Sequence, residues 1–170
     1  MRVMVRAFVL ATATAVGVLA PVSAQAETPK RIGAHVGFVL PLVSRAGGTT
    51  TTVADDFVFG LPAGMRVAKV GRFVVDMEAV TGIQNSPRDV SLELHPGVVT
   101  AVAPKLAAGL RAAFDIEGHS WGFTPLLNRT LYVARSHSLF GEVVVPVRFS
   151  DAARGATKSV GLAVHVGIGF

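Results

Sequence analysis

The chain of 170 residues contains no cysteine. Without a thiol it can form no disulfide, and it cannot carry the lipid-modified cysteine that anchors a lipoprotein. Non-covalent packing and hydrogen bonding must therefore hold the fold together. The absence of disulfides is still compatible with export from the cytoplasm.

Aromatic residues other than phenylalanine are nearly absent, because the chain has one tryptophan and one tyrosine, Trp121 and Tyr132. Charged residues make up only 16% of the sequence, and the basic ones are scattered without a run of three. A nucleic-acid-binding surface needs clustered basic side chains with aromatic residues between them. We therefore expect no nucleic-acid partner.

No stretch of the chain is both apolar and long enough for a transmembrane helix, which needs roughly 20 residues. The longest apolar run, 7–20, follows Arg2 and Arg6 and precedes Ala24-Gln25-Ala26. This order is typical of a secretory signal peptide with its cleavage site. We expect residues 1–26 to be a cleaved signal peptide for Sec export, and 27–170 to form one domain of 144 residues (170 − 26).

In place of long apolar runs, the sequence alternates apolar residues with small or polar ones. The alternation is most regular over 160–170, where Val160, Leu162, Val164, Val166, Ile168 and Phe170 form one row and Gly161, Ala163, His165, Gly167 and Gly169 form the other. A period of two residues predicts a β-strand. Eight segments follow this pattern, and we expect strands over 30–42, 57–67, 73–80, 90–102, 106–116, 123–133, 139–149 and 160–170.

The segments between these strands divide into two kinds. Three are short turns, at 69–71, 103–105 and 135–138, and four are longer loops, at 43–52, 81–89, 117–122 and 151–157. Gly71 stands where a three-residue hairpin turn needs a left-handed residue. Pro62, inside an expected strand, predicts a bulge or a weak point in the ladder. The strand over 123–133 is the least regular, because Pro125 and Asn128 interrupt it.

The second row of residues indicates which face of the sheet meets lipid. In a soluble protein this row would face water and carry many Lys, Glu and Asp residues. In the last strand it consists of Gly, Ala and His, which suits the crowded interior of a narrow barrel. The sequence therefore predicts an antiparallel transmembrane β-barrel, with eight strands and its apolar row outside; a soluble periplasmic all-β binding protein is the alternative.

The signal peptide and the last strand, which ends on Phe170, resemble those of small bacterial outer-membrane barrels of the OmpA, OmpX and OmpW type. The resemblance implies a Gram-negative outer membrane, short turns on the periplasmic side, and lipids and lipopolysaccharide around the barrel. It also implies periplasmic chaperones and the barrel-assembly machinery as partners during biogenesis. Val166, Ile168 and Phe170 would be the assembly signal that this machinery reads.

Charged residues in the second row are forced into the lumen, where unpaired charges are costly. Besides Arg31 and Asp56, we expect there an ion-pair network of Arg66, Asp76, Glu78, Glu93, Arg111, Asp115, Glu142 and Arg148. An eight-stranded lumen filled in this way leaves no large pore. It predicts a structural or surface-interaction role, and the alternative is a narrow channel or small-ligand carrier.

The sequence also bears on two further functions, divalent-cation binding and lipid modification. Acidic residues expected at one rim, Asp76, Glu78, Glu93, Asp115 and Glu117, are weak candidates for a divalent-cation site, although we expect no metal and no cofactor. A lipid-modifying enzyme would start from Ser91, Glu93 and His95. Ser91 and His95 stand about 13 Å apart on one strand and cannot share a proton, so we expect no enzyme.

Overall fold

The computed structural model of this protein describes residues 33–85, 87–117, 119–150 and 157–170, and every regular element in them is a β-strand. The predicted signal peptide, 1–26, and Arg31 lie outside the described residues. None of the described segments forms a helix long and apolar enough to cross a membrane.

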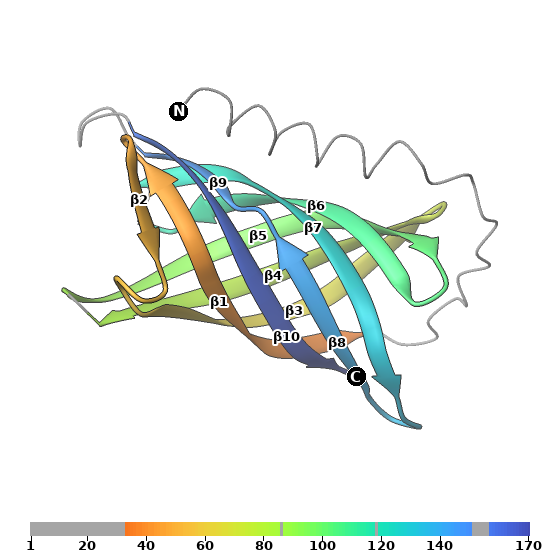
Figure 1. Ribbon diagram of the computed structural model, residues 1–170. Coiled ribbons are helices and arrows are strands. Elements are labelled where there is room, and N and C mark those ends of the chain that lie inside the picture. Colours follow the sequence, from red (N-terminus) through yellow and green to blue (C-terminus); the bar gives the residue numbers. More distant parts are fainter. Residues whose placement is uncertain (1–32, 86, 118, 151–156) are drawn as a thin grey trace.

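Ten antiparallel strands form one sheet that closes on itself (Figure 1). They are β1 (Ala34–Ala46), β2 (Thr49–Thr52), β3 (Val58–Val70), β4 (Phe73–Asn85), β5 (Arg88–Ala103), β6 (Leu106–Asp115), β7 (Ser120–Val133), β8 (Ser138–Val144), β9 (Val147–Ser150) and β10 (Lys158–Gly169). The ring of hydrogen bonds runs β1-β3-β4-β5-β6-β7-β8-β10 and back to β1. The predicted fold class, an antiparallel barrel of eight ring strands, is confirmed.

The predicted strand 139–149 occupies one position in the wall but is divided into β8 and β9. Both parts pair with β7 on one side and β10 on the other. The break falls at Val145 and Pro146, where proline has no N–H to donate to a ladder. The neighbouring groups compensate, since Val145 N donates to Pro125 O (3.0 Å) and Gly161 N donates to Pro146 O (2.9 Å).

Two predicted loops were wrong. In 43–52, β1 continues to Ala46 and forms a hairpin with β2, whose Thr49–Thr52 pairs with the end of β1. In 81–89, β4 continues to Asn85 and β5 already begins at Arg88, so that the two strands remain paired almost to their tips. In the first segment Gly47-Gly48, both with positive φ, form a two-residue hairpin turn and the Thr residues favour a strand. The second segment has the composition of a loop, and pairing between β4 and β5 overrides that preference.

The short turns follow the sequence more closely. Gly71 has the predicted left-handed backbone, with a φ of 59°, and Lys105 adopts the same φ of 59° in the next short turn. Pro62 does not cause a bulge, because it keeps its register opposite Val80; the register shifts further along β3, between Arg66 and Ala68. The less regular strand 123–133 is confirmed within β7, which begins at Ser120.

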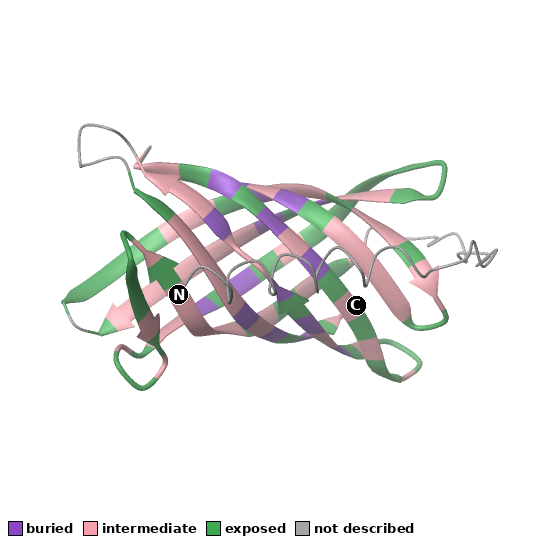
Figure 2. Ribbon diagram, turned by 45° about the horizontal axis from the view of Figure 1, so that its top comes forward, coloured by how far each residue is buried: buried purple, intermediate pink, exposed green. Residues whose placement is uncertain are grey.

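The apolar row faces outward around the barrel, as predicted. Exposed large apolar side chains occur on every strand of the ring, among them Val36, Leu61, Met77, Val98, Leu110, Leu127, Val143 and Val166. The buried residues alternate with them along the strands (Figure 2). Only a small apolar cluster lies inside, made of Leu126, Val144 and Ala163 with Val39 and Val99 against it. Phe140 and Val147 are also buried, and the other buried residues of the described interior are polar or small.

Candidate functional site

The centre of the lumen is organised by Arg111 on β6, which is 5% exposed. Its Nε and Nη2 donate to Asp76 Oδ2 at 3.2 and 3.0 Å, and its Nη1 donates to Glu142 Oε1 at 2.9 Å. Nη1 also lies 3.5 Å from Glu78 Oε1. One guanidinium group therefore ties β6 to β4 and to β8 across the lumen.

A glycine allows Arg111 to reach Asp76. In the sheet, Asp76 pairs with Gly97 on β5, and Gly97 pairs in turn with Arg111. The three residues thus share one row across three strands. A Cβ at Gly97 would collide with the Arg111 side chain, so the missing side chain leaves the space in which the guanidinium crosses β5.

A second arginine, Arg148 on β9, holds the next part of the lumen. Its Nη2 donates to Glu93 Oε2 at 2.7 Å, and its Nε donates to Glu93 Oε2 at 3.1 Å and to Oε1 at 3.3 Å. Its Nη1 donates to the Thr124 hydroxyl at 3.0 Å. The fork geometry of guanidinium suits such multiple bonds to one carboxylate.

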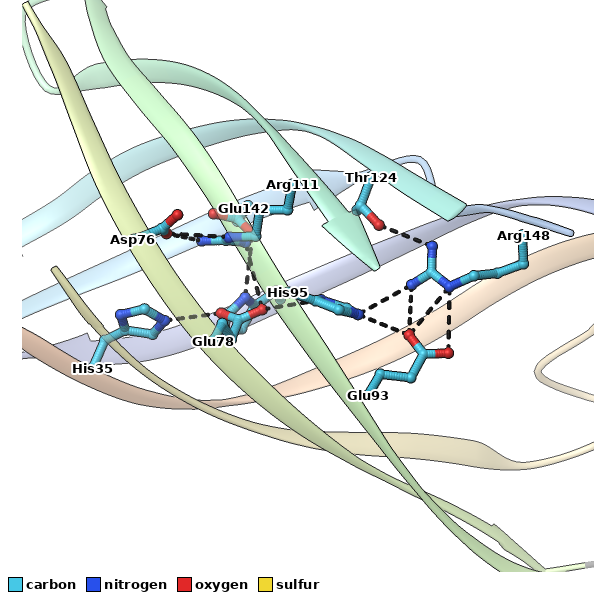
Figure 3. Close-up of polar contacts among 10 residues, drawn as sticks. His35, Asp76, Glu78, Glu93, His95, Arg111, Thr124, Glu142 and Arg148 are labelled. Carbon is cyan, nitrogen blue, oxygen red and sulfur yellow. Dashed lines mark hydrogen bonds and ion pairs between the residues drawn. The ribbon is translucent and has the colours of Figure 1, made fainter. Parts of the chain in front are cut away.

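His95 joins the two arginine clusters (Figure 3). Its Nδ1 lies 3.6 Å from Glu78 Oε1, and its Nε2 lies 2.7 Å from Glu93 Oε2. Two further histidines complete the network, because His35 Nε2 lies 2.8 Å from Glu78 Oε2 and His165 Nδ1 lies 3.3 Å from Glu142 Oε1. The sequence indicated these histidines only as residues of the lumen row; the structure gives each a carboxylate partner.

The network contains four carboxylates, Asp76, Glu78, Glu93 and Glu142, but only two guanidinium groups. Three histidines also contact these carboxylates. Asp76, Glu78, His95, Arg111, Glu142 and His165 are each at most 6% exposed. These buried charges lie at the middle of the lumen.

Most of the predicted network residues gather as expected. Asp76, Glu78, Glu93, Arg111, Glu142 and Arg148 form it. Arg66 does not join, because it is exposed and makes no ion pair with any residue that the structure describes. Asp115 does not join either; its carboxylate lies 3.6 Å from His119 Nδ1 and accepts a hydrogen bond from Glu117 N. Asp56 accepts a hydrogen bond from Gln84 Nε2 at 3.0 Å.

The acidic rim expected for a cation site does not exist. Because β4 extends to Asn85, Asp76 and Glu78 lie well inside the barrel, and Asp76 is level with Arg111. Asp115 stands four residues further along β6 from Arg111, about 13 Å away. The described residues contain no group of three or more His, Asp or Glu side chains arranged to bind a metal ion.

A cavity of about 450 Å³ occupies the end of the lumen where the short turns lie. Its floor is the network itself, with Asp76, Arg111 and Glu142. Lys69 and Arg72 lie near its mouth, together with Arg66 and Arg135. The cavity is thus a vestibule that ends at the ion pairs.

The enzymatic alternative finds no support in the contacts of His95. Both of its ring nitrogens face carboxylates, and its Nε2 also lies 3.3 Å from Arg148 Nη2. None of the hydroxyl groups in the described ranges is hydrogen-bonded to His95. A histidine held in this way orients neighbouring charges and is not placed to activate a nucleophile.

Comparison with known proteins gives little beyond the geometry. No protein-family model matches the chain, and no curated protein matches it. Among solved structures it is similar to one described as "De novo design of transmembrane beta-barrels", with 15% sequence identity and a TM-score of 0.40 over 82% of this chain and 99% of that one. A TM-score this low adds nothing to the fold, which rests on the strand pairing itself.

Proposed function

We propose that this chain is an integral outer-membrane β-barrel of a Gram-negative cell envelope, exported through the Sec pathway, with a structural or surface-interaction role. Its lumen admits no large solute, and it is neither an enzyme nor dependent on a cofactor. The observation that carries the proposal is the inverted distribution of side chains. The outer wall is apolar on every ring strand, whereas ion pairs fill the inside.

The inverted distribution makes a soluble form of this barrel unfavourable. Apolar surface in water costs about 25 cal/mol for each Å², and the wall exposes large apolar side chains on all sides. Hydrocarbon around the barrel removes this cost, while the closed ring satisfies every strand edge in the wall. The soluble periplasmic alternative would require the apolar row to face a core.

We also propose that Val166, Ile168 and Phe170 carry the assembly signal read by the barrel-assembly machinery. Val166 and Ile168 lie on the outward row of β10, Phe170 follows the strand directly, and all three are exposed. A partner could therefore read them before the barrel meets lipid. Periplasmic chaperones would protect the same apolar row during transit, and lipids and lipopolysaccharide would surround it afterwards.

Membrane fractionation with a heat-modifiability gel tests this proposal. We expect the protein in the outer-membrane fraction, as a band that shifts when the sample is boiled, because a closed barrel resists detergent until heated. We further expect no measurable conductance in planar bilayers. A soluble protein without a shift would overturn the membrane assignment, and a large steady conductance would overturn the closed lumen.

The vestibule favours a second candidate function, a small-ligand carrier. Its volume of about 450 Å³ is within the range of small-molecule sites, and Arg66 in its wall has no ion-pair partner among the described residues. Binding of inorganic phosphate to the reconstituted barrel, measured by equilibrium dialysis, tests this candidate. Binding that is lost in Arg66→Gln would support it, and no binding by the native chain would reject it.

A further inference from the structure

The two ends of the barrel differ strongly in charge. We call the end with the β3–β4, β5–β6 and β7–β8 turns the turn end (right in Figure 1). Each of these turns carries a basic residue, and the described cations of this end are Arg66, Lys69, Arg72, Lys105, Arg129 and Arg135. Outside the lumen network, the described residues of the turn end include no Asp or Glu side chain.

The opposite end has the reverse balance. Its described cations are Arg45, Arg88 and Lys158, and its carboxylates are Asp55, Asp56, Asp89, Asp115 and Glu117. Outside the network, the described side chains are therefore six cations and no Asp or Glu at the turn end, and three cations with five carboxylates at the other end. Such a separation of charge along the barrel axis fits an anionic surface at the turn end only.

Arg129 indicates what kind of surface this is. It lies on the outward row of β7 between Leu127, 45% exposed, and Leu131, 53% exposed. A charge pointing out of an apolar wall is costly unless its side chain reaches the polar headgroups. Lys105 lies next to it, because Thr130 N donates to Lys105 O at 2.9 Å. Two basic residues therefore lie on neighbouring parts of the chain at the boundary between the apolar wall and the turns.

Arg72 shows the same combination on another turn. Its guanidinium carbon lies 5.2 Å from the centre of the Phe73 ring, which is itself exposed on the outer wall. This cation–π contact holds the guanidinium group beside the outer wall, at the level of the turn. The cations are spread over three turns and are not gathered in one patch, which suits several singly charged headgroups better than one multiply phosphorylated lipid.

We propose that the turn end binds the headgroups of anionic glycerophospholipids, with Arg72, Lys105, Arg129 and Arg135 facing the lipid phosphates. This inference rests on the proposed membrane function. It adds that the leaflet around the turns is recognised by charge, whereas the opposite leaflet is not. Each cation near an anionic membrane surface strengthens association by about fivefold.

The test compares two triple variants of the full chain reconstituted into phosphatidylcholine vesicles. One variant removes a cation from each short turn, Arg72→Gln, Lys105→Gln and Arg135→Gln. The control removes three cations from the opposite end, Arg45→Gln, Arg88→Gln and Lys158→Gln, and changes the net charge equally. Association of spin-labelled phosphatidylglycerol is measured relative to spin-labelled phosphatidylcholine.

We expect the native barrel and the control variant to prefer phosphatidylglycerol by about fivefold at each turn, and the turn-end variant to lose this preference. Added salt should weaken the preference because these charges are exposed. Equal association of both lipids with the native barrel, or an equal loss in both variants, would overturn the inference. A heat-modifiable band in the same vesicles shows separately whether the membrane barrel itself has formed; if it fails to form, the proposed function fails first.

Discussion

At the scale of single residues, Arg111 is the position on which the lumen depends most. Three buried carboxylates, on Asp76, Glu78 and Glu142, lie within 3.5 Å of its guanidinium group. A buried ion pair adds little stability by itself, because desolvation offsets the attraction between the charges. Removing one partner of the pair destabilises the fold strongly, because the remaining charges stay buried without an opposite charge beside them.

Arg111→Met should therefore lower the free energy of unfolding by about 3–5 kcal/mol. The measurement is urea-induced unfolding of the barrel in lipid vesicles. Arg66→Gln is the matched control, because Arg66 also belongs to the lumen row but is exposed; its effect should stay within about 0.5 kcal/mol. Equal effects of the two substitutions would contradict the network described above.

A second residue-scale prediction concerns the loop after β2. The backbone N–H and the hydroxyl of Thr52 donate to Asp55 Oδ2 at 2.8 and 2.7 Å, and these bonds lower the pKa of Asp55. Because the pKa of Asp55 is lower in the folded chain, these bonds stabilise the loop fully at pH values above the Asp55 pKa of the unfolded chain. This stabilisation is lost as the pH falls through the Asp55 pKa of the folded chain. Amide exchange at Thr52, corrected for intrinsic pH dependence, should become less protected on acidification. Asp55→Asn should remove that pH dependence.

At the scale of strands, close packing between neighbours matters more than strand propensity. Gly122 on β7 lies directly against the backbone of β9, where an added Cβ would collide with the Val147 carbonyl group. Gly141 on β8 offers a comparison, since a Cβ there would meet the Leu131 side chain at 3.5 Å, an ordinary contact.

Gly122→Ala should accordingly destabilise the barrel by about 1–3 kcal/mol, as overpacking does in well-filled interiors. Gly141→Ala should have a much smaller effect. The temperature at which the unboiled band converts to the unfolded band reports both. If the two alanines shift this temperature equally, the contact between β7 and β9 is not as tight as described.

The strands also show which features of the fold could be predicted from the sequence alone. Alternation predicted the outward and inward faces correctly, because a residue's parity within a strand decides its face. It missed the pairing of Thr49–Thr52 with β1, although Gly47-Gly48, both with positive φ, form a local two-residue hairpin turn that the sequence could have indicated. Nor could it predict that Arg111 meets Asp76, because such a meeting depends on the stagger between strands and on the gap at Gly97. The partners of His95 could have been suspected, since it shares a row with Glu93.

At the scale of the whole molecule, the proposed assembly signal can be separated from stability. Phe170 is 64% exposed, and its backbone N–H donates to Ala34 O at 2.8 Å. Phe170→Ala keeps that backbone bond, so refolding of the purified barrel into detergent should change by no more than about 0.5 kcal/mol.

In cells, the same variant should give clearly less heat-modifiable barrel. Phe73→Ala is the control, because Phe73 is also an exposed phenylalanine at the turn end but begins β4, far from the last strand in the sequence. A normal level of Phe170→Ala, or an equal loss with Phe73→Ala, would show that the machinery does not read this residue.

The pairing of β1 with β10 has a further consequence, for the order in which the barrel forms. His35 pairs with Gly169, so residues 134 positions apart in the sequence (169 − 35) must meet before the ring closes. The hairpins from β3 to β8 involve much shorter separations and can form earlier. Pairing of β1 with β10 is then the slow step. Its entropic cost is offset only when all the hydrogen bonds between these two strands have formed. Once closed, the wall has no free end at this seam from which to unravel, which predicts slow unfolding for a barrel without any covalent crosslink.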